Sequence, residues 1–344
     1  MGVNVSVVAV DAGNSKTDVA LIGTDGTVLA TARGGGFQPP AVGMEAAVDV
    51  VAAALERAVA ELPAPERAAA EPSAPERAVA ELPVPPGSLG HVSACLANAD
   101  LPVEEAELAE ALAARGWGTS VEVRNDTFAI LRAGVDEPRG VAVVCGAGIN
   151  CVGMVPDGRT ARFPAIGRIS GDWGGGGGLA EEALWFAARA EDGRGEPTEL
   201  ARTLPGHFGL DSMYALIEAL HRGAIPPVRR HELTPVLFAT GAAGDAVAAA
   251  LVERQAEEVV AMASVALTRL GLLEEEVPVL LGGSVLAARH PRLNDRIAEL
   301  LAARAPKAVV RVVSEPPVLG AALLGLDRTG AAPEVHRRLR EQYA

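Results

Sequence analysis

The sequence predicts an α/β protein that consists of two similar halves. Three observations support this class: strand-like apolar segments alternate with helical segments, one hairpin pattern occurs twice, and the length fits two domains. Residues 7–30 contain an apolar run, a glycine turn, a second apolar run and an Asp-Gly pair before a third run, and residues 141–159 repeat this order. Asp-Gly favours a type I′ hairpin turn. Two such halves that face each other predict a cleft.

Length and composition narrow the class further. The chain has 344 residues, 49% of them hydrophobic, which suits two cores at roughly 150 residues per domain. The formal net charge of -14 argues against a nucleic-acid partner or an anionic membrane surface, because both need a basic face. The three cysteines are too few and too irregularly spaced for a disulfide framework. We expect them to be small core residues in a reducing cytosol.

Targeting and membrane-spanning segments are not expected. The apolar run at residues 5–10 lacks a basic flank and is interrupted by Asp11, so it does not fit a secretory signal peptide. The longest uncharged apolar run near the C-terminus, residues 318–326, is far shorter than the ~20 residues that a membrane helix needs. We therefore expect a cytoplasmic protein with no membrane partner.

Strands and helices alternate along the rest of the chain, as in mixed sheets flanked by helices. Asp245 is a suitable N-cap for a long amphipathic helix. The glycine-dense stretch predicts a loop. We expect, in order, a strand at 90–96, a helix at 103–115, a strand at 120–124, a glycine-dense loop at 167–178, a helix from Leu179, a helix from 245 to about 270 and a strand at 277–281.

Residues 55–84 form a tandem repeat of ten-residue units that contain Glu-Arg-Ala. Proline in each unit excludes one continuous helix, although Pro-Glu-Arg-Ala suits a first helical turn. We interpret the repeat as an insertion in a helix-to-strand connection, with short helical turns or a mobile surface excursion. A partner-binding role is the alternative.

Residues 11–17 combine a carboxylate with a polar turn. Asp11 ends a predicted strand, and the residues that follow it are Gly13, Asn14, Ser15, Lys16 and Thr17 after one alanine. Free backbone amides and small hydroxyls suit phosphate oxygens, and the carboxylate suits a hydrated magnesium ion. The glycine spacing and the strand that follows exclude a Walker A loop. An ordinary hairpin turn with a polar tip is the alternative.

A second turn of this kind follows the predicted strand at 141–145. Gly146, Ala147 and Gly148 would let the backbone approach a phosphate closely. A structural turn is the alternative for this motif alone. The pairing with the turn after Asp11 favours phosphate binding.

Two carboxylates are further candidates. Asp126 lies at a strand end and could accept the proton of a hydroxyl that attacks a γ-phosphate, as kinases require. A helix cap is its alternative role. Asp172 follows Gly171 in the glycine-dense loop, where a small ligand could approach; a loop turn is the alternative.

Gly282, Gly283 and Ser284 form a strand-to-helix turn on which a flat ring such as adenine could lie. We find no pattern for zinc or for a serine nucleophile.

Taken in order, these segments resemble the BadF/BadG-type ATPase family and, within it, the N-acetylglucosamine kinases of the actin and sugar-kinase superfamily. Residues 11–17 resemble the first phosphate motif of the family, residues 146–148 the second, and residues 281–284 the adenosine motif. Asp126 falls where the family has its catalytic base. Residues 96–100 and 167–172 resemble its two sugar-side loops, with Asn98 in the first and Gly167 and Asp172 in the second.

The sequence departs from the family pattern at three places. Gln38 is the nearest match to an asparagine that touches the sugar in the family. Residues 171–175 read Gly-Asp-Trp-Gly-Gly where the family usually has Gly-Asp-Glu-Gly-Ser, which replaces a carboxylate with the indole of Trp173. Ala147 replaces a threonine, which keeps the backbone but removes a hydroxyl. These changes concern the choice of sugar more than phosphoryl transfer.

The resemblance implies two actin-like, ribonuclease H-like domains with mixed five-stranded sheets flanked by helices, and an ATP cleft between them. It places residues 1–136, with the 55–84 insertion, and residues 316–344 in the N-terminal domain, and residues 137–315 in the C-terminal one. It implies a homodimer that uses ATP and Mg²⁺ to phosphorylate a hydroxyl of N-acetylglucosamine or a glucosamine-like hexose. Asp126 would be the base and Asp11 the metal residue.

The implied binding residues form two sets. Those for ATP are Asp11, Gly13, Asn14, Ser15, Lys16, Thr17, Gly146, Ala147, Gly148, Gly241, Gly282, Gly283 and Ser284, and those for the sugar are Gln38, Asn98, Asp126, Gly167 and Asp172. One alternative is a BadF-type ATPase that activates a partner dehydratase through a cysteine-bound iron-sulfur cluster. Another is an actin-like regulatory module that binds ATP without phosphate transfer. Glucokinases with a cysteine-rich zinc motif are disfavoured, because no clustered cysteines occur.

Overall fold

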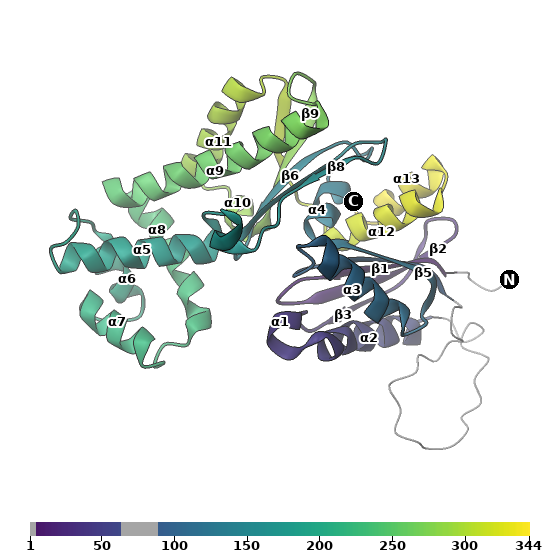
Figure 1. Ribbon diagram of the computed structural model, residues 1–344, viewed down its shortest axis with the longest axis horizontal. Coiled ribbons are helices and arrows are strands. Elements are labelled where there is room, and N and C mark those ends of the chain that lie inside the picture. Colours follow the sequence, from purple (N-terminus) through teal and green to yellow (C-terminus); the bar gives the residue numbers. More distant parts are fainter. Residues whose placement is uncertain (1–4, 63–88) are drawn as a thin grey trace, which may run out of the picture. The chain divides into compact units, whose positions relative to one another are not determined.

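The structure, a computed structural model, describes residues 5–62 and 89–344 (Figure 1). The described residues form two compact units, one from Met1–Pro138 and Val313–Ala344 and the other from Arg139–Val312. Each unit contains a five-stranded mixed sheet with helices packed on it. The predicted α/β class with two similar halves is confirmed.

Unit 1, the first of these, is built on the sheet β3-β2-β1-β4-β5. Helices α2 and α3 pack on one face of this sheet, and α4 and α12 pack on the other (Figure 1). The bounds are β1 Val5–Ala12, β2 Thr17–Gly23, β3 Val28–Gly34, α1 Pro39–Val42, α2 Met44–Ala60, β4 Leu89–Leu96, α3 Pro102–Ala113, β5 Gly118–Asn125, α4 Thr127–Ala133, α12 Pro317–Thr329 and α13 Pro333–Glu341.

Unit 2, the remaining residues, repeats this arrangement with the sheet β10-β9-β6-β7-β8. Its hydrophobic core includes side chains of the sheet and of helices α5, α8 and α9. The bounds are β6 Gly140–Cys145, β7 Ile149–Met154, β8 Thr160–Arg162, a 3-10 helix Gly167–Ser170, α5 Gly175–Glu191, α6 Leu200–His207, α7 Met213–His221, a 3-10 helix Pro227–Glu232, α8 Leu233–Ala242, α9 Ala246–Leu270, β9 Val277–Gly282, α10 Gly283–Ala287, α11 Pro291–Arg304 and β10 Ala308–Val312.

The two sheets have one topology. In unit 1 the strands β1, β2 and β3 are antiparallel neighbours, and β4 and β5 continue from β1 in parallel. In unit 2, β6, β7 and β8 are antiparallel, and β9 and β10 continue from β6 in parallel. The hairpin pattern that occurs twice in the sequence is therefore the antiparallel half of each sheet.

The hairpin turns were predicted correctly in place but not in type. A type I′ turn needs positive φ at both central residues. Gly26 and Gly158 have φ of 85° and 89°, whereas neither Asp25 nor Asp157 is among the residues with positive φ. The Asp25 carboxylate instead accepts a hydrogen bond from the amide of Thr27 at 3.0 Å. The aspartate thus stabilises the turn with its side chain, and only the glycine enters the left-handed region.

The helix at the centre of unit 2 matches its prediction. Asp245 caps α9 by accepting a hydrogen bond from the Ala248 amide at 2.8 Å, and the helix ends before Gly271, which has a left-handed φ of 74°. The start predicted at Leu179 is wrong, because α5 begins at Gly175. The first residues of the 55–84 repeat belong to α2, which ends at Ala60. Residues 63–84 of the repeat lie outside the described part of the chain.

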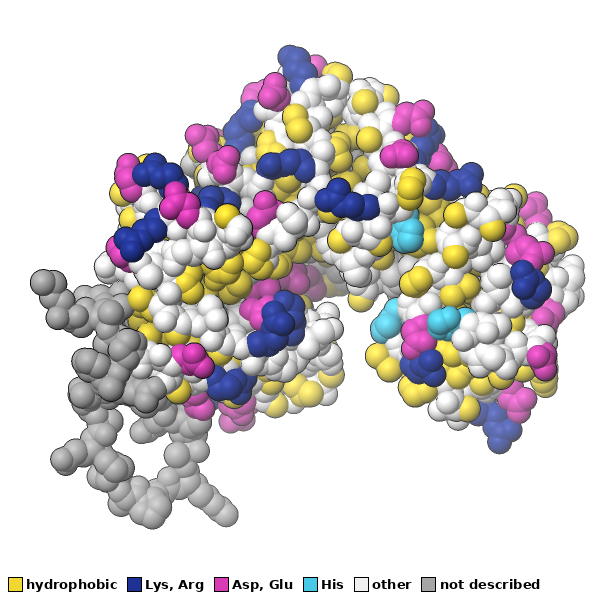
Figure 2. Space-filling model, turned by 180° about the vertical axis from the view of Figure 1, so that it is seen from behind, with side chains coloured by type: hydrophobic (Ala, Val, Ile, Leu, Met, Phe, Trp, Pro, Cys, Tyr) yellow, Lys and Arg dark blue, Asp and Glu magenta, His cyan; other side chains and the backbone are white. Residues whose placement is uncertain are grey.

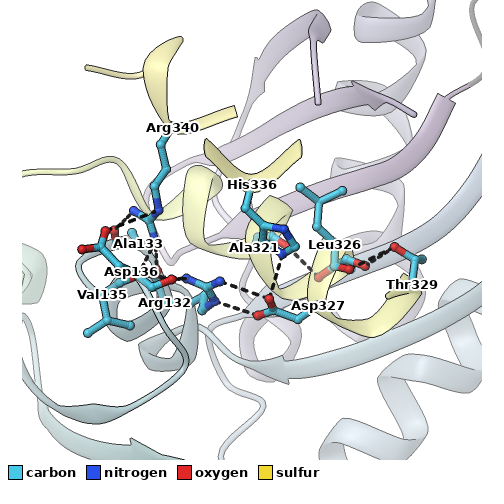
Figure 3. Close-up of polar contacts among 12 residues, drawn as sticks. Arg132, Ala133, Val135, Asp136, Ala321, Leu326, Asp327, Thr329, His336 and Arg340 are labelled. Atoms are coloured by element: carbon cyan, nitrogen blue, oxygen red, sulfur yellow. Dashed lines mark hydrogen bonds and ion pairs between the residues drawn. The ribbon is translucent and has the colours of Figure 1, made fainter. Parts of the chain in front are cut away.

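A polar network joins the C-terminal helices of unit 1 to the end of α4 (Figure 3). Arg132, whose side chain is 2% exposed, forms two hydrogen bonds with the Asp327 carboxylate, at 2.7 and 3.0 Å. His336 Nε2 lies 2.9 Å from the same carboxylate. Arg340 donates to the carbonyl oxygens of Ala133, at 2.8 Å, and of Val135. The network anchors α12 and α13 on the rest of unit 1.

On the face of each unit drawn in Figure 2, acidic and basic side chains are interspersed. Among the described residues no single helix is long and apolar enough to cross a membrane, although the bent pair Pro227–Ala242 and Ala246–Leu270, at 111°, passes a test of length and composition together.

Candidate functional site

The candidate residues of unit 1 lie at one edge of its sheet. Strands β1, β4 and β5 are parallel, so their carboxyl ends meet there. Asp11 lies near the end of β1, Asn98 follows β4, and Asp126 follows β5. The loops are tied by backbone hydrogen bonds from Ala97 N to Ala12 O, at 2.8 Å, and from Asp126 N to the carbonyl that ends β4, at 3.2 Å. The parallel half of the sheet therefore assembles residues from three separate motifs.

The turn between β1 and β2 leaves backbone donors free. Gly13 N donates to Lys16 O at 2.8 Å and closes the turn. The buried hydroxyl of Thr17 donates to Gly35 O at 2.9 Å, so it serves the fold and is not available to a ligand as a donor. The amides of Asn14 and Ser15 are exposed and meet no acceptor within the described part of the chain. Two free amides on a tight turn suit an anion.

Asn14 connects this turn to the two predicted sugar-side residues. Gln38 Nε2 donates to the backbone oxygen of Asn14 at 2.7 Å. Asn98 Nδ2 donates to Asn14 Oδ1 at 3.1 Å and to Phe37 O at 3.3 Å. Asn98 has a left-handed φ of 63°, which turns its side chain toward the hairpin. The first phosphate motif and the two amide side chains therefore form one hydrogen-bonded assembly.

Two carboxylates at this edge have raised pKa values. Burial raises the pKa of Asp11 to about 7, the Asp126 carboxylate adds to the effect, and Lys16 opposes it. Burial also raises the pKa of Asp126 to about 6, against hydrogen bonds from Thr127. Raised carboxyl pKa values with a specific charged neighbour are typical of functional sites.

Asp126 does not cap the helix that follows it. It occupies the N-cap position of α4, but its side chain makes no capping hydrogen bond. Asn125 Oδ1 accepts from the Thr127 amide instead, at 3.0 Å. The Asp126 carboxylate accepts hydrogen bonds from Thr127, the first residue of α4, but makes no N-cap bond to the helix, so the helix-cap alternative is not supported.

Asp18 is a site residue that the sequence reasoning missed. It lies opposite Asp11 in the β1–β2 register. Arg33 Nε donates to it at 2.6 Å and Lys16 forms an ion pair with it. Burial would raise the pKa of Asp18, but the hydrogen bonds from Arg33 and Lys16 keep it below its usual value. Asp18 therefore holds the ammonium of Lys16 beside the turn.

In unit 2 the second turn is held by the glycine-rich start of α5. Gly146 N donates to Gly148 O at 3.0 Å within the turn. Gly176 N and Gly177 N donate to the carbonyl oxygens of Gly146 and Ala147, both at 2.8 Å. The first amides of a helix have no partner within the helix, and here the turn supplies their acceptors. This is why α5 begins four residues earlier than predicted.

The same contacts explain why glycines occupy the start of α5. A Cβ at Gly175, which has φ of 70°, would lie 2.5 Å from Gly148 O, so no side chain fits there. The amides of Ala147 and Gly148 meet no acceptor among the described residues. As in the first turn, two adjacent amides are free.

The adenosine motif lies beside this turn. Strands β6 and β9 are parallel neighbours, so Gly282 and the turn after Cys145 share one edge. Gly283 has φ of 81°, and a Cβ there would lie 2.4 Å from Cys145 O. Ser284 follows in α10. Gly241, in contrast, contacts α9 and α11: it packs on the backbone of Ala248, and its carbonyl accepts from Arg292 at 3.0 Å.

A cavity of about 290 Å³ in unit 2 contains both kinds of predicted residue. Its lining includes Ala147 and Gly148 from the second turn and Gly167 and Asp172 from the sugar-side loop. The Asp172 carboxylate accepts from the Gly167 amide at 3.0 Å, which fixes the loop. A larger cavity of about 620 Å³ lies between α6 and α8 and contains none of the predicted residues.

The lining of the smaller cavity also includes residues that were not predicted from the sequence. Glu181 and Glu182 reach the cavity from α5, and Arg168 pairs with Glu182. Trp173 is buried, with the Arg254 guanidinium 4.3 Å from its ring centre. The run of five glycines was the only sequence signal for this packing.

The described side chains can be compared with the needs of a metal site. Among the described residues no group of three or more His, Cys, Asp or Glu side chains could hold a metal ion. The Asp11 carboxylate fits a hydrated Mg²⁺ ion, which proteins often hold through one or two carboxylates together with substrate phosphates. The cysteines do not fit a cluster: all three are buried, and burial raises the pKa values of the Cys145 and Cys151 thiols.

The chain is similar in sequence to two curated sugar kinases. An N-acetylmuramic acid/N-acetylglucosamine kinase of Clostridium acetobutylicum is 25% identical over 228 residues, which cover 66% of this chain and 74% of that protein. An N-acetyl-D-glucosamine kinase of Dictyostelium discoideum is 26% identical over 216 residues, 62% of this chain and 67% of that protein.

Solved structures show the fold. A Chromobacterium violaceum protein provisionally named an N-acetylglucosamine kinase has a TM-score of 0.68 at 23% identity, with 93% of this chain and 98% of that chain covered. A ROK family glucokinase from Streptomyces griseus has a TM-score of 0.55 at 17% identity, with 94% and 99% covered. The actin-like sugar-kinase fold is therefore confirmed. The family model described as the BadF/BadG/BcrA/BcrD ATPase family matches residues 8–325, and this chain belongs to that family.

Proposed function

We propose that this protein is an ATP-dependent sugar kinase that transfers the γ-phosphate to a hydroxyl of an amino sugar, N-acetylglucosamine or a glucosamine-like hexose. The observation that carries the proposal is the edge of unit 1, where a turn with free amides, two carboxylates of raised pKa and two amide side chains form one assembly. Family membership and the names of the curated relatives support ATP and an amino sugar.

In this proposal Asp126 is the general base. A carboxylate with a pKa of about 6 is ionised at neutral pH and is a stronger proton acceptor than an ordinary aspartate. It would take the proton of the attacking hydroxyl. Gln38 and Asn98 would contact the sugar and orient that hydroxyl. Gly167 and Asp172 of the second sugar-side loop are further candidates for sugar contacts.

The phosphates would be held mainly by backbone. The free amides of Asn14 and Ser15, with Gly13 closing their turn, are donors in unit 1, and Lys16 adds a positive charge that Asp18 fixes. The free amides of Ala147 and Gly148 are donors in unit 2. Thr17 stabilises the first turn through the hydrogen bond from its hydroxyl to Gly35 O. Donors placed before the reaction stabilise phosphate charge without reorganisation.

The remaining ATP contacts are those to the metal ion and to the adenosine. Asp11 would hold Mg²⁺ through water, and the ion supplies charge neutralisation on the phosphates when bound. Gly282, Gly283 and Ser284 would carry the adenosine, because the missing side chains leave the backbone open to a flat ring.

The test of the proposal is an ADP-release assay with ATP, Mg²⁺ and a panel of hexoses, hexosamines and N-acetylated hexosamines. We expect one or more amino sugars to stimulate ADP release and to yield a phosphorylated sugar detectable by mass spectrometry. If no sugar responds while ATP hydrolysis is strong, the kinase proposal is wrong, and an ATPase that acts on a partner protein takes its place.

The pH dependence follows from the pKa values of Asp126 and Asp11. Both the base and the metal residue must be ionised, and burial raises their pKa values to about 6 and about 7. We therefore expect kcat/KM to begin to fall below pH 7 and to fall by up to about 100-fold for each pH unit below pH 6. The rate should be measured by a discontinuous assay that needs no coupling enzymes, with circular dichroism to establish that the fold is intact at the acid end. A profile that stays flat through pH 5 would contradict the role of Asp126.

The position of the first turn can be tested with a pair of neighbouring glycines. A Cβ at Gly36 would lie 2.2 Å from Asn14 O, whereas a Cβ at Gly35 would meet nothing closer than 3.9 Å. We expect Gly36→Ala to displace the turn and to weaken the binding of an ATP analogue by about tenfold, the usual scale of overpacking. Gly35→Ala is the matched control and should bind normally. Calorimetric titration compares the two, and equal affinities would remove the turn from ATP binding.

A further inference from the structure

Gln255 is a polar residue in the hydrophobic core of unit 2. It lies in α9 beside Val252, Ala256 and Val259 and is 0% exposed. A buried amide is destabilising unless its groups find hydrogen-bond partners. Gln255 Oε1 accepts from the Gly175 amide at 2.8 Å, and its Nε2 lies 3.7 Å from the sulfur of Cys145. Gln255 therefore bridges two segments of the candidate site.

The first of these segments is the start of α5. Gly175 N is the first amide of that helix and has no acceptor within it. A Cβ at Gly174, which has φ of 97°, would lie 2.1 Å from Gln255 Oε1, so the backbone approaches Gln255 as closely as a glycine allows. The preceding residue Trp173 lies under the guanidinium of Arg254. Two consecutive residues of α9 thus hold residues 173–175.

The second segment is the second phosphate turn. Cys145 ends β6 directly before Gly146. The helix start that Gln255 holds also donates to this turn, through the amides of Gly176 and Gly177. Asp172 lies just before residues 173–175 and lines the cavity of about 290 Å³ together with Ala147. The amide of Gln255 therefore contacts residues next to both sides of this cavity: Gly175, which follows the lining residue Gly174, and Cys145, which precedes the turn.

We propose that Gln255 is a positioning residue that keeps the second phosphate turn and the Asp172 loop in one fixed relation. This inference rests on the proposed function, since it assigns ATP to the turn and the sugar to the loop. Gln255 contacts neither ligand. It supplies the acceptor that the Gly175 amide lacks, so its loss lets the helix start move, and the turn and the loop move with it.

The test compares Gln255→Met with Val259→Ala. Methionine keeps the length of the side chain and removes both hydrogen bonds, whereas Val259→Ala creates a cavity in the same helix, one turn further from the site. Both variants should unfold at a lower temperature than the unaltered protein. Only Gln255→Met should lower kcat/KM, by roughly tenfold or more, the scale of leaving one buried donor unpaired. The loss should include a higher KM for ATP.

A second measurement does not depend on turnover. In a background of Trp117→Phe and Trp185→Phe, Trp173 is the remaining tryptophan of the three in the chain. Gln255→Met should shift its emission to longer wavelength and weaken the binding of ADP, and Val259→Ala should do neither. If Gln255→Met binds ADP and emits like the Trp117→Phe, Trp185→Phe background without it, or if Val259→Ala loses the same kcat/KM, Gln255 is not a positioning residue. If the unaltered protein phosphorylates no sugar, the proposed function fails, while ADP binding and emission still test Gln255.

Discussion

Replacing Asp126 with asparagine should lower kcat for sugar phosphorylation by about 100-fold or more and leave the affinity for ADP nearly unchanged. Asparagine has the size of aspartate but cannot accept the proton. Asparagine keeps a side-chain oxygen that can accept from Thr127 as the carboxylate does, so the start of α4 should lose little by the change. Rapid-quench measurement of the phosphorylated sugar and calorimetric titration with ADP give the two quantities separately.

Asn125→Ala is the matched control for this variant. Asn125 Oδ1 accepts from the Thr127 amide, and its Nδ2 donates to the Asp100 carboxylate at 2.8 Å, so Asn125→Ala removes two hydrogen bonds and should destabilise the protein by about 1–3 kcal/mol. If a loosened helix start were enough to stop the reaction, Asn125→Ala would be as inactive as Asp126→Asn. Full activity of Asp126→Asn would remove Asp126 from the mechanism, and an equal loss of ADP affinity would assign it to nucleotide binding instead.

Much of this site was predictable because it follows from strand order. A polar residue directly after an apolar strand lies at the carboxyl end of that strand, and parallel neighbours bring such ends together. Asp11, Asn98 and Asp126 could therefore be placed at one edge of unit 1, and Gly146 and Gly283 at one edge of unit 2, without knowledge of the remaining contacts.

The supporting residues could not be found in this way. Asp18 and Gln255 have no motif of their own, because each acts on a partner that is distant in sequence or on the opposite strand. The start of α5 was missed for a related reason. Glycine disfavours helices, and the acceptors that allow Gly175–Glu191 to begin with four glycines lie in the turn some thirty residues earlier.

Replacing Asp327 with alanine should destabilise unit 1 by about 3–5 kcal/mol, because it leaves a buried guanidinium without its counterion. The Arg132 side chain is 2% exposed, and within residues 5–62 and 89–344 its two bonds to the Asp327 carboxylate are its only ones to an acidic side chain. Its remaining donors reach the backbone oxygens of Val135 and Asp136, at 2.8 and 3.2 Å. Backbone oxygens cannot neutralise the charge. Urea unfolding followed by Trp117, the tryptophan of unit 1, measures the loss.

The pH dependence of this stabilisation has a defined sign. Burial would raise the pKa of Asp327, but the hydrogen bonds from His336 and Arg132 keep it below its usual value. A carboxyl with a lowered pKa stabilises the folded state above its unfolded pKa of about 4, and this contribution is lost as the pH falls through the folded value. The unfolding midpoints of the unaltered protein and of Asp327→Ala should therefore converge toward acid pH.

Two further variants separate the ion pair from the packing around it. Asp136 has a fully exposed carboxylate 4.0 Å from Arg340, so Asp136→Asn should leave the midpoint unchanged. The double variant Arg132→Met with Asp327→Leu removes both charges at similar volume and should recover much of the loss, since an apolar pair has no ion left to solvate. If Asp327→Ala unfolds like the unaltered protein, or if the double variant is less stable than Asp327→Ala, the buried charge of Arg132 is not what makes Asp327 necessary.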